Sequence, residues 1–277
     1  MKLKLQGSTV LLTGASSGIG LEMARQLAPK VARLILVARR VDKLEQLRAE
    51  LIQQTPALRV DLEPCDLADL PSVDALCDKI AADDTLVDVL INNAGVGDLG
   101  LFERSDMKKI LFLIRLNCES PLLLTRRLLP GMIERRKGGV LNVSSGFGLA
   151  VLPGMAAYIG SKHFMTGFTE ALRLEAAGTG VVITQSCPGP VRSEFADHIG
   201  NFTGQQAPGI VEIDASTCAR QSLAAFERGR ALFIPGFVIW LVMLSNAITP
   251  RWIKRLIMWP LSRALRRKQL AAQASTP

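Results

Sequence analysis

Short apolar runs alternate with longer amphipathic stretches along most of the chain. Runs rich in Val, Ile and Leu are typical of strands buried on both faces, and the stretches between them have the spacing of helices that cover a sheet. The apolar runs predict strands at 9–12, 34–38, 59–63, 87–91, 140–143, 181–186 and 231–234. The amphipathic stretches predict helices at 19–27, 42–54, 70–82, 106–136, 156–176 and 214–228.

This alternation predicts an α/β fold built from repeated βαβ units, with a doubly wound parallel sheet at its centre. No internal repeat and no Ser/Gly-rich linker interrupts the pattern before Pro235. We therefore expect one domain at 1–234, followed by an apolar and basic helical extension at 235–277.

Composition and charge narrow the class of protein. The 277 residues are 48% hydrophobic and 21% charged, which fits a folded globular chain and not a disordered one. The formal net charge of +8 is concentrated at one end, because residues 228–277 hold nine Lys or Arg and no acid, whereas the rest has 24 basic and 25 acidic residues. A nucleic-acid-binding protein usually spreads basic residues over a folded face, so we expect no nucleic-acid partner.

Cysteine and histidine usage argues against a metal site. The five cysteines are far apart and odd in number, which matches neither a disulfide framework nor a thiolate site and favours a reducing compartment. The two histidines lack ligand spacing, so we expect no metal.

The apolar residues 10–12 end at Thr13, too short a run for a secretory leader. We expect a cytoplasmic protein, either free or at the cytosolic face of a membrane.

A glycine-rich turn follows the first predicted strand and opens the first predicted helix. It reads Thr13-Gly14-Ala15-Ser16-Ser17-Gly18-Ile19-Gly20. Glycines let the backbone approach a pyrophosphate, and the unpaired N–H groups of a helix N-terminus bind it. The spacing G-x-x-x-G-x-G differs from the common G-x-G-x-x-G fingerprint, so the turn alone is also consistent with simple chain reversal.

Four further motifs give the turn a context. They are Asn92-Asn93-Ala94-Gly95 after the fourth strand, Asn117 in the long helix, Ser144-Ser145 after the fifth strand, and Tyr158-Ile159-Gly160-Ser161-Lys162 at the start of the next helix. Together with the glycine turn, this ordered set resembles the short-chain dehydrogenase/reductase family, in its short single-domain branch. The resemblance covers residues 5–193 and the strand near Leu232. It implies a Rossmann-like, seven-stranded sheet of order 3-2-1-4-5-6-7.

Tyr158 and Lys162 are four residues apart on a predicted helix and therefore share one face. A nearby ammonium favours a phenolate, so we expect the pKa of Tyr158 to fall toward working pH. The resemblance implies that Tyr158 exchanges a proton with the substrate oxygen, Ser145 hydrogen-bonds that oxygen, Lys162 holds the nicotinamide ribose and Asn117 supports a water relay. Ser145 is preferred over Ser144 because it lies thirteen residues before Tyr158.

The end of the second strand bears on the choice of cofactor. It reads Val37-Ala38-Arg39-Arg40 and contains no acid that could receive a ribose 2′-hydroxyl, whereas Arg39 suits a 2′-phosphate. We therefore predict NADP(H). The residues predicted to bind it, several by resemblance alone, are Gly14, Ser16, Ser17, Gly18, Ile19, Gly20, Arg39, Arg40, Asp66, Leu67, Asn93, Ala94, Gly95, Tyr158, Lys162, Pro188, Gly189, Val191 and Ser193. Asn92 is expected to wall the same pocket.

The loop at 147–155 carries no charge and favours an apolar substrate, although it is equally consistent with packing beneath the variable loop at 194–213. We expect an NADPH-dependent oxidoreductase that interconverts a carbonyl and an alcohol on an acyl-chain, steroid-like or retinoid-like substrate. Two alternatives stay open: an NADP(H)-binding regulatory or membrane-associated protein, and an oxidative steroid or retinoid dehydrogenase.

The resemblance also implies a homodimer, paired through the helices that carry Asn117 and Tyr158.

The last fifty residues need their own explanation. No charge occurs at 231–250, but Pro235-Gly236 leaves an apolar helix of about a dozen residues, which is too short to span a membrane. Residues 251–259 then place apolar side chains, two tryptophans among them, on one arc and basic side chains on the other. This pattern is typical of a helix that lies on a membrane surface. A cover over the substrate cleft and a subunit contact are the alternatives.

Overall fold

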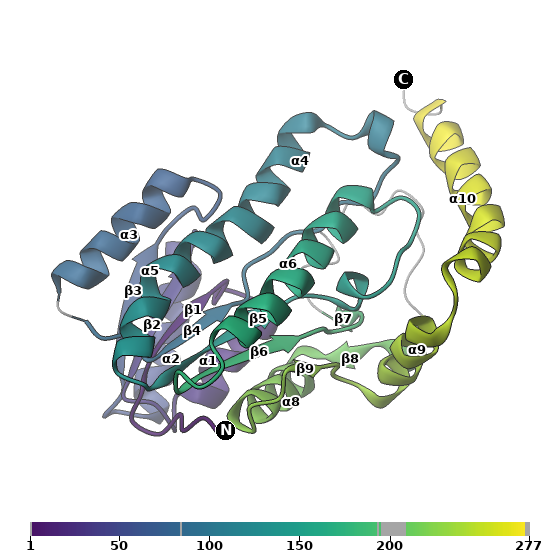
Figure 1. Ribbon diagram of the computed structural model, residues 1–277. Coiled ribbons are helices and arrows are strands. Elements are labelled where there is room, and N and C mark those ends of the chain that lie inside the picture. Colours follow the sequence, from purple (N-terminus) through teal and green to yellow (C-terminus); the bar gives the residue numbers. More distant parts are fainter. Residues whose placement is uncertain (1, 84, 193, 195–208, 275–277) are drawn as a thin grey trace.

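Seven parallel strands form the central sheet, in the order β3-β2-β1-β4-β5-β6-β9 (Figure 1). The computed structural model describes residues 2–83, 85–192, 194 and 209–274. The strands of the sheet are β1 Thr9–Thr13, β2 Arg33–Ala38, β3 Arg59–Pro64, β4 Val89–Asn92, β5 Gly138–Val143, β6 Val181–Ser186 and β9 Leu232–Phe233. The predicted order is confirmed, since β9 is the seventh strand of this sheet.

Helices cover both faces of the sheet (Figure 1). They are α1 Gly18–Leu27, α2 Val41–Gln54, α3 Leu70–Ala82, α4 Met107–Ile114, α5 Ser120–Glu134, α6 Ala156–Glu175, α8 Ala215–Glu227, α9 Phe237–Ile248 and α10 Arg251–Ala274. One hydrophobic cluster joins the sheet to α1, α2 and α8, and a second joins its other face to α3, α5 and α6. None of the described helices has the combined length and apolarity of a membrane span.

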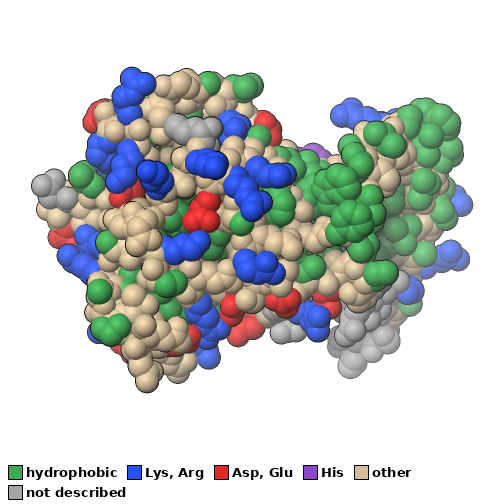
Figure 2. Space-filling model, turned by 90° about the horizontal axis from the view of Figure 1, so that it is seen from below, with side chains coloured by type: hydrophobic (Ala, Val, Ile, Leu, Met, Phe, Trp, Pro, Cys, Tyr) green, Lys and Arg blue, Asp and Glu red, His purple; other side chains and the backbone are tan. Residues whose placement is uncertain are grey.

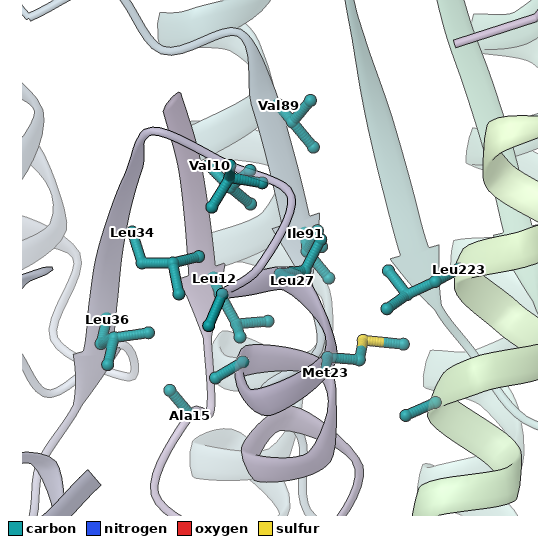
Figure 3. Packing of buried hydrophobic residues seen from close by; sticks show 14 of the residues in the cluster. Val10, Leu12, Ala15, Met23, Leu27, Leu34, Leu36, Val89, Ile91 and Leu223 are labelled. Atoms are coloured by element: carbon teal, nitrogen blue, oxygen red, sulfur yellow. The ribbon is translucent and has the colours of Figure 1, made fainter. Parts of the chain in front are cut away.

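Strands with two buried faces explain the continuous apolar runs of the sequence. Leu11 and Leu12 are neighbours in β1, both are fully buried, and they belong to the two different clusters. Around Leu12, the side chains of Leu36, Met23 and Leu223 bring β2, α1 and α8 together (Figure 3). Because side chains alternate along a strand, an apolar residue at every position supplies both layers of the core.

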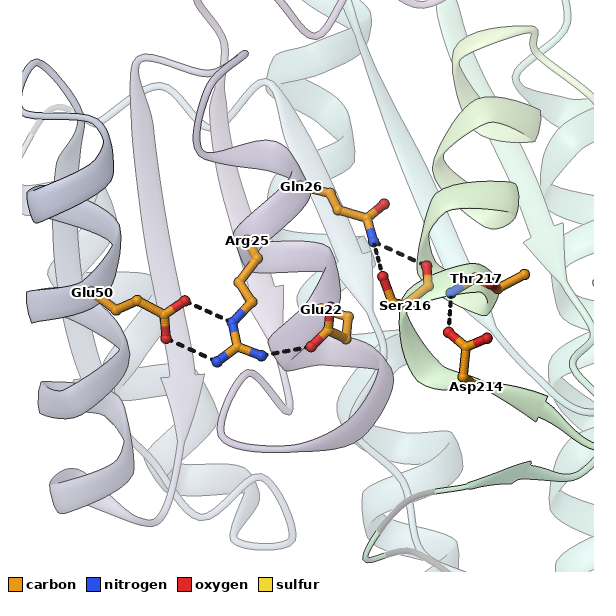
Figure 4. A network of polar contacts seen from close by, with 7 residues as sticks. All are labelled: Glu22, Arg25, Gln26, Glu50, Asp214, Ser216 and Thr217. Carbon is orange, nitrogen blue, oxygen red and sulfur yellow. Dashed lines mark hydrogen bonds and ion pairs between the residues drawn. The ribbon is translucent and has the colours of Figure 1, made fainter.

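Polar contacts tie α1 to its neighbours on the outer side of this layer (Figure 4). The Arg25 guanidinium donates to both carboxylate oxygens of Glu50 in α2, at 2.8 and 2.9 Å, and to Glu22 one turn earlier at 2.6 Å. Gln26 Nε2 donates to the Ser216 carbonyl at 3.0 Å, which links α1 to α8. These groups are partly exposed, so they orient the helices more than they stabilise them.

The predicted helix at 106–136 is in fact interrupted. It consists of α4, a π-helical turn at Arg115–Glu119 and α5, a break that hydrophobic spacing alone does not reveal. A π turn inserts one extra residue and re-aims the side chains next to it. Here it lies at Asn117.

Three other features differ from the prediction. The fourth strand begins at Val89 and not at 87, and α10 continues to Ala274, through Pro260. The third is a separate sheet of two strands, β7 Val191–Arg192 and β8 Ile213–Asp214. Two-residue strands are too short to leave a periodic pattern.

Glycines close the turn between β1 and α1. Gly14 has φ of +69°, which only glycine adopts without strain. A Cβ on Gly20 would overlap the carbonyl oxygen of Gly14 and crowd the Asn93 side chain. The first turn of α1 therefore packs directly against the backbone of the loop.

We expect Gly20→Ala to lower the free energy of unfolding by about 2–3 kcal/mol, because the added methyl group forces backbone atoms apart. Gly167→Ala is the matched control, since Gly167 lies inside α6 with no atom within 4 Å of an added Cβ. That change should raise stability by about 0.5–1 kcal/mol through helix propensity. Urea unfolding of both variants measures the difference, and equal effects would contradict the close packing of Gly20.

Candidate active site

A cleft of about 1030 Å³ runs along the edge at which the parallel strands end. Residues at or just after the ends of β1 to β6 line it, as do residues of α9 and α10. In open α/β sheets, this edge is where ligands bind. The fold therefore brings together motifs that are up to 175 residues apart in the sequence, from Gly14 to Gly189.

The serine, tyrosine and lysine of the sequence motifs meet in this cleft. The Tyr158 hydroxyl forms a hydrogen bond with the Ser145 side chain, and both residues are buried. Lys162 Nζ lies 5.8 Å from the centre of the Tyr158 ring and donates to the Val143 carbonyl at 3.3 Å. Phe147 N donates to Ser145 Oγ at 3.1 Å, which fixes the serine side chain.

The prediction of a lowered tyrosine pKa is wrong for this structure. Burial raises the pKa of Tyr158 to about 12, although the hydrogen bond with Ser145 acts in the opposite direction. Burial also lowers the pKa of Lys162 from 10.5 to about 8. Sequence spacing predicts the proximity of the two groups, but not their removal from water, which disfavours the charged form of each. At neutral pH, Tyr158 is therefore a neutral phenol and can act as a proton donor.

Asn117 lies behind the cleft and is absent from its lining. Its Nδ2 donates to the Val96 carbonyl at 2.9 Å and to Ser161 Oγ at 3.0 Å, while its Oδ1 accepts from Val96 N at 3.0 Å. The π turn thus aims Asn117 at the backbone of the loop after β4 and at α6. A Cβ on Gly95 would lie 3.1 Å from Asn117 Oδ1 and 3.4 Å from Lys162 Nζ, so this loop passes close to both.

Most of the predicted cofactor residues line the cleft. They are Gly14, Ser16, Ser17, Gly18, Ile19, Arg39, Arg40, Asp66, Leu67, Asn93, Ala94, Gly95, Tyr158, Lys162, Pro188, Gly189 and Val191. Gly20 lies behind the turn, where it permits close packing, and Ser193 falls outside the described residues. The N-terminus of α1 begins at Gly18, which lines the cleft together with Ser17 and Ile19, so these residues fit the pyrophosphate of a dinucleotide.

The two arginines after β2 take different positions. Arg40 donates to Ser16 Oγ at 3.1 Å and to Glu194 at 2.9 Å, whereas the Arg39 guanidinium lies 5.6 Å from the centre of the Phe112 ring. Both line the cleft. Of the two, Arg39 has a stacked guanidinium whose donors are not engaged by any hydrogen bond among the described residues. It can therefore receive a phosphate without first breaking an ion pair.

Asn92, expected to wall the pocket, points elsewhere. Its Nδ2 donates to Asn142 Oδ1 at 2.8 Å, and Asn142 in turn donates to Thr169 Oγ1 at 2.9 Å. The three side chains are buried and connect β4, β5 and α6 beneath the cleft. Asn92 therefore does not wall the pocket as expected. It is the last residue of β4, and its side chain enters the layer between strands and helices. The next residue, Asn93, faces the cleft instead.

The C-terminal extension supplies cleft residues that the sequence analysis did not name, although it kept a cover over the cleft as an alternative. Ile239 and Met243 of α9 and Leu261 and Leu265 of α10 line the same cavity. Their apolar character was visible in the sequence, but no motif connects the C-terminal extension to the strand ends. Asn246 Nδ2 donates to the Leu149 carbonyl at 2.7 Å, which holds α9 against the loop before α6.

Comparison with known proteins agrees with this geometry. The family model described as short chain dehydrogenase matches residues 8–203, which include the glycine turn and the Ser, Tyr and Lys motifs. This chain belongs to the short-chain dehydrogenase/reductase family. The family resemblance expected from the sequence is thereby confirmed, and with it an oxidoreductase of this family.

Two curated relatives show how far the likeness extends. Dehydrogenase/reductase SDR family member 7 of Homo sapiens is 35% identical to this dehydrogenase over 198 residues, which cover 70% of this chain and 58% of the relative. Nodulation protein G of a Rhizobium species is 37% identical over 198 residues, covering 72% of this chain and 79% of the relative. The chain thus spans little more than half the length of the human relative.

Solved structures share the fold of this dehydrogenase. A short-chain dehydrogenase from Sphingobium yanoikuyae, in complex with NADPH, is 28% identical with a TM-score of 0.77, covering 87% of this chain and 93% of its own. A bulky-bulky ketone specific alcohol dehydrogenase from Comamonas testosteroni is 26% identical with a TM-score of 0.73, covering 86% and 91%. These proteins show the fold that this chain shares, and the first of them holds NADPH.

We expect Lys162→Met to raise the free energy of unfolding at pH 7 by about 1–3 kcal/mol, because it removes a buried cation whose pKa is lowered to about 8. Between about pH 8 and 10.5, folded wild type has lost a proton that the unfolded chain still holds, so wild-type stability rises with pH. The advantage of the variant should therefore shrink across this window. Urea unfolding at pH 7 and pH 10 tests both the sign and the trend; a destabilised variant would contradict the burial argument.

Proposed function

We propose that this protein is an NADPH-dependent oxidoreductase that interconverts a carbonyl and a primary or secondary alcohol on an apolar substrate. One observation carries the proposal: Ser145, Tyr158 and Lys162 lie together in a cleft that also holds the glycine turn and the two arginines after β2. Proton donor, dinucleotide turn and phosphate partners are thus present in one place. The catalytic unit is residues 1–234, and the extension at 235–277 completes the cleft.

Tyr158 is the general acid in the reductive direction. Because its pKa is raised to about 12, it holds its proton at neutral pH and can donate it to a carbonyl oxygen as negative charge develops there. Ser145 is hydrogen-bonded to the same hydroxyl and orients the substrate oxygen beside it. Lys162 stabilises the phenolate that the proton transfer leaves, since its ammonium lies over the ring of Tyr158. Asn117 holds the loop and helix that position these groups.

The cofactor supplies the hydride in this chemistry. The residues proposed to hold it are the glycine turn, Asp66 and Leu67 after β3, Asn93 to Gly95 after β4, and Pro188 to Val191 after β6, all of which line the cleft. Ser193 is part of the same proposal. Arg39 and Arg40 favour a cofactor with a 2′-phosphate, and the NADPH in the related Sphingobium structure supports that choice.

The substrate part of the cleft favours apolar molecules. Where the loop before α6 and the helices α9 and α10 border the cleft, the lining side chains of the described residues are mostly apolar. The side chains that line it there are those of Leu99, Phe147, Leu152, Pro153, Met155, Ile239, Met243, Leu261 and Leu265. Desolvating a charged substrate against such walls is unfavourable, whereas an acyl chain or a fused ring gains from burial. The bulky-ketone activity stated for the Comamonas relative supports a large carbonyl substrate.

We also propose a homodimer that pairs through α4, α5 and α6. α4 and α6 pack side by side, and both carry exposed apolar residues. These include Met107 and Leu111 of α4 and Phe164 of α6. Phe164 stacks on Phe168 with ring centres 6.2 Å apart, which gives this face a flat aromatic surface. Burial of such a face between two copies is favourable.

We expect Tyr158→Phe to lower kcat for carbonyl reduction by about 10²–10⁴-fold, because it deletes the proton donor and leaves the cofactor residues intact. NADPH binding, followed by its fluorescence, should stay within a factor of about two to three. His163→Ala is the control, since its exposed ring contacts the Ile159 carbonyl on another side of α6. A Tyr158→Phe variant with near-normal kcat would place the acid elsewhere.

We expect wild type to bind NADPH at least tenfold more tightly than NADH, because a charge-assisted phosphate contact contributes about 1.5–3 kcal/mol. The double variant Arg39→Ala/Arg40→Ala should lose most of this preference while NADH affinity changes little. Arg48→Ala removes an exposed charge from α2 outside the cleft and should keep the preference. Titration of both cofactors measures the ratio; equal affinities in wild type would refute the assignment.

A further inference from the structure

The helices α9 and α10 have two apolar sides. Ile239 and Met243 face inward and are buried at the cleft, as is Leu265 of α10. Their other sides are exposed and apolar as well. A surface helix of a globular protein normally has one apolar stripe and an opposite polar face, so the outer apolar side requires a partner.

The exposed apolar residues of the two helices make up what we name the C-terminal apolar surface. Figure 2 shows hydrophobic side chains gathered over this end of the molecule. Of 22 large hydrophobic residues that are exposed in the described part of the chain, 12 belong to it. They are Phe237, Trp240, Leu241, Val242, Leu244, Ile248, Trp252, Leu256, Ile257, Trp259, Leu261 and Leu270. All three tryptophans of the sequence are among them.

Positive charge lies on α10, next to its exposed apolar residues. α10 carries seven Lys or Arg, and residues 228–277 contain no acid. Trp259 stacks against Arg263, whose guanidinium carbon lies 5.4 Å from the centre of the aromatic ring. Tryptophan and arginine side by side are suited to the boundary between lipid tails and headgroups, where the ring is buried and the cation reaches a phosphate.

We propose that the C-terminal apolar surface docks on an anionic lipid membrane, with α9 and α10 lying along it. α9 has 12 residues and is about 18 Å long, well short of the hydrocarbon core of about 30 Å. Charge decides between the candidate partners. A second copy of this surface, related by two-fold symmetry, would bring two clusters of cations together, and α9 and α10 contain no acid to offset them, whereas anionic headgroups neutralise them.

The helices are fastened to the body of the protein, so docking also orients the cleft. Leu101 N donates to Gln269 Oε1 at 2.6 Å, and Arg266 forms an ion pair with Glu103 at 2.7 Å. Both contacts join α10 to the segment between β4 and α4. Because Leu261 lines the cleft and is itself 38% exposed, the cleft reaches the docking surface. If the proposed apolar substrate is correct, it can enter from the lipid.

Flotation of the full-length protein with vesicles tests the docking. We expect it to float with vesicles of phosphatidylcholine mixed with phosphatidylglycerol at low salt, less at high salt, and weakly with phosphatidylcholine alone. Leu256→Glu/Trp259→Glu should abolish flotation. Arg255→Gln/Arg267→Gln/Lys268→Gln should weaken binding to the anionic vesicles by on the order of 100-fold, since each basic residue contributes about fivefold.

Leu86→Glu/Leu174→Glu adds the same charge at exposed leucines far from α9 and α10 in the sequence, and it should float like wild type. Reduction of a water-soluble carbonyl should be unchanged in the α10 variants, because none of these side chains lines the cleft. Loss of flotation with retained activity thus separates docking from the proposed catalysis. Wild type that never floats would overturn the proposal, because the surface would then have no lipid partner. A mass in solution that halves in the variant Leu256→Glu/Trp259→Glu would overturn it in favour of a second copy as the partner. Resistance to carbonate extraction would overturn it in favour of a span.

Discussion

The parallel alignment of the strands is the constraint on which the site depends. Because every strand of the central sheet runs in the same direction, the ends of β1 to β6 lie at one edge, and the residues after them line one cleft. Parallel strands require long crossovers, which the helices on both faces supply. The same arrangement buries each strand on both sides, so core and site follow from a single topology.

Burial at this edge determines the chemistry of the polar groups. Lys162 is buried with the Val143 carbonyl as a hydrogen-bond acceptor, and Tyr158 is equally buried beside Ser145. The pKa values of both groups move toward their neutral forms, and at neutral pH the buried Lys162 cation destabilises the fold, whereas Tyr158 is neutral in the folded and the unfolded chain alike. Beneath them, Asn92, Asn142 and Thr169 form a chain of hydrogen bonds that ties the strands to α6.

The C-terminal helices extend the common fold. Their inner side supplies part of the cleft, and their outer side carries most of the exposed large apolar residues in the described chain. Apolar lining and apolar exterior thus belong to the same two helices. The proposed apolar substrate and the proposed lipid-binding surface are consistent with each other. The apolar walls of the cleft on this side and the apolar outer surface come from the same segment, an uncharged stretch followed by a basic helix.

The sequence by itself determined the fold class, the strand order through its family resemblance, and the residue types of the site, because hydrophobic periodicity and short motifs are local properties of the chain. It placed Tyr158 and Lys162 on one face of a helix and Arg39 at the end of a strand. Only the tertiary structure decided what depends on distant neighbours. The inward direction of Asn92, the opposite pKa shift of Tyr158 and the entry of α9 and α10 into the cleft all arise from contacts between segments far apart in sequence. No local pattern encodes such contacts, since burial is a property of the assembled layers and not of a single segment.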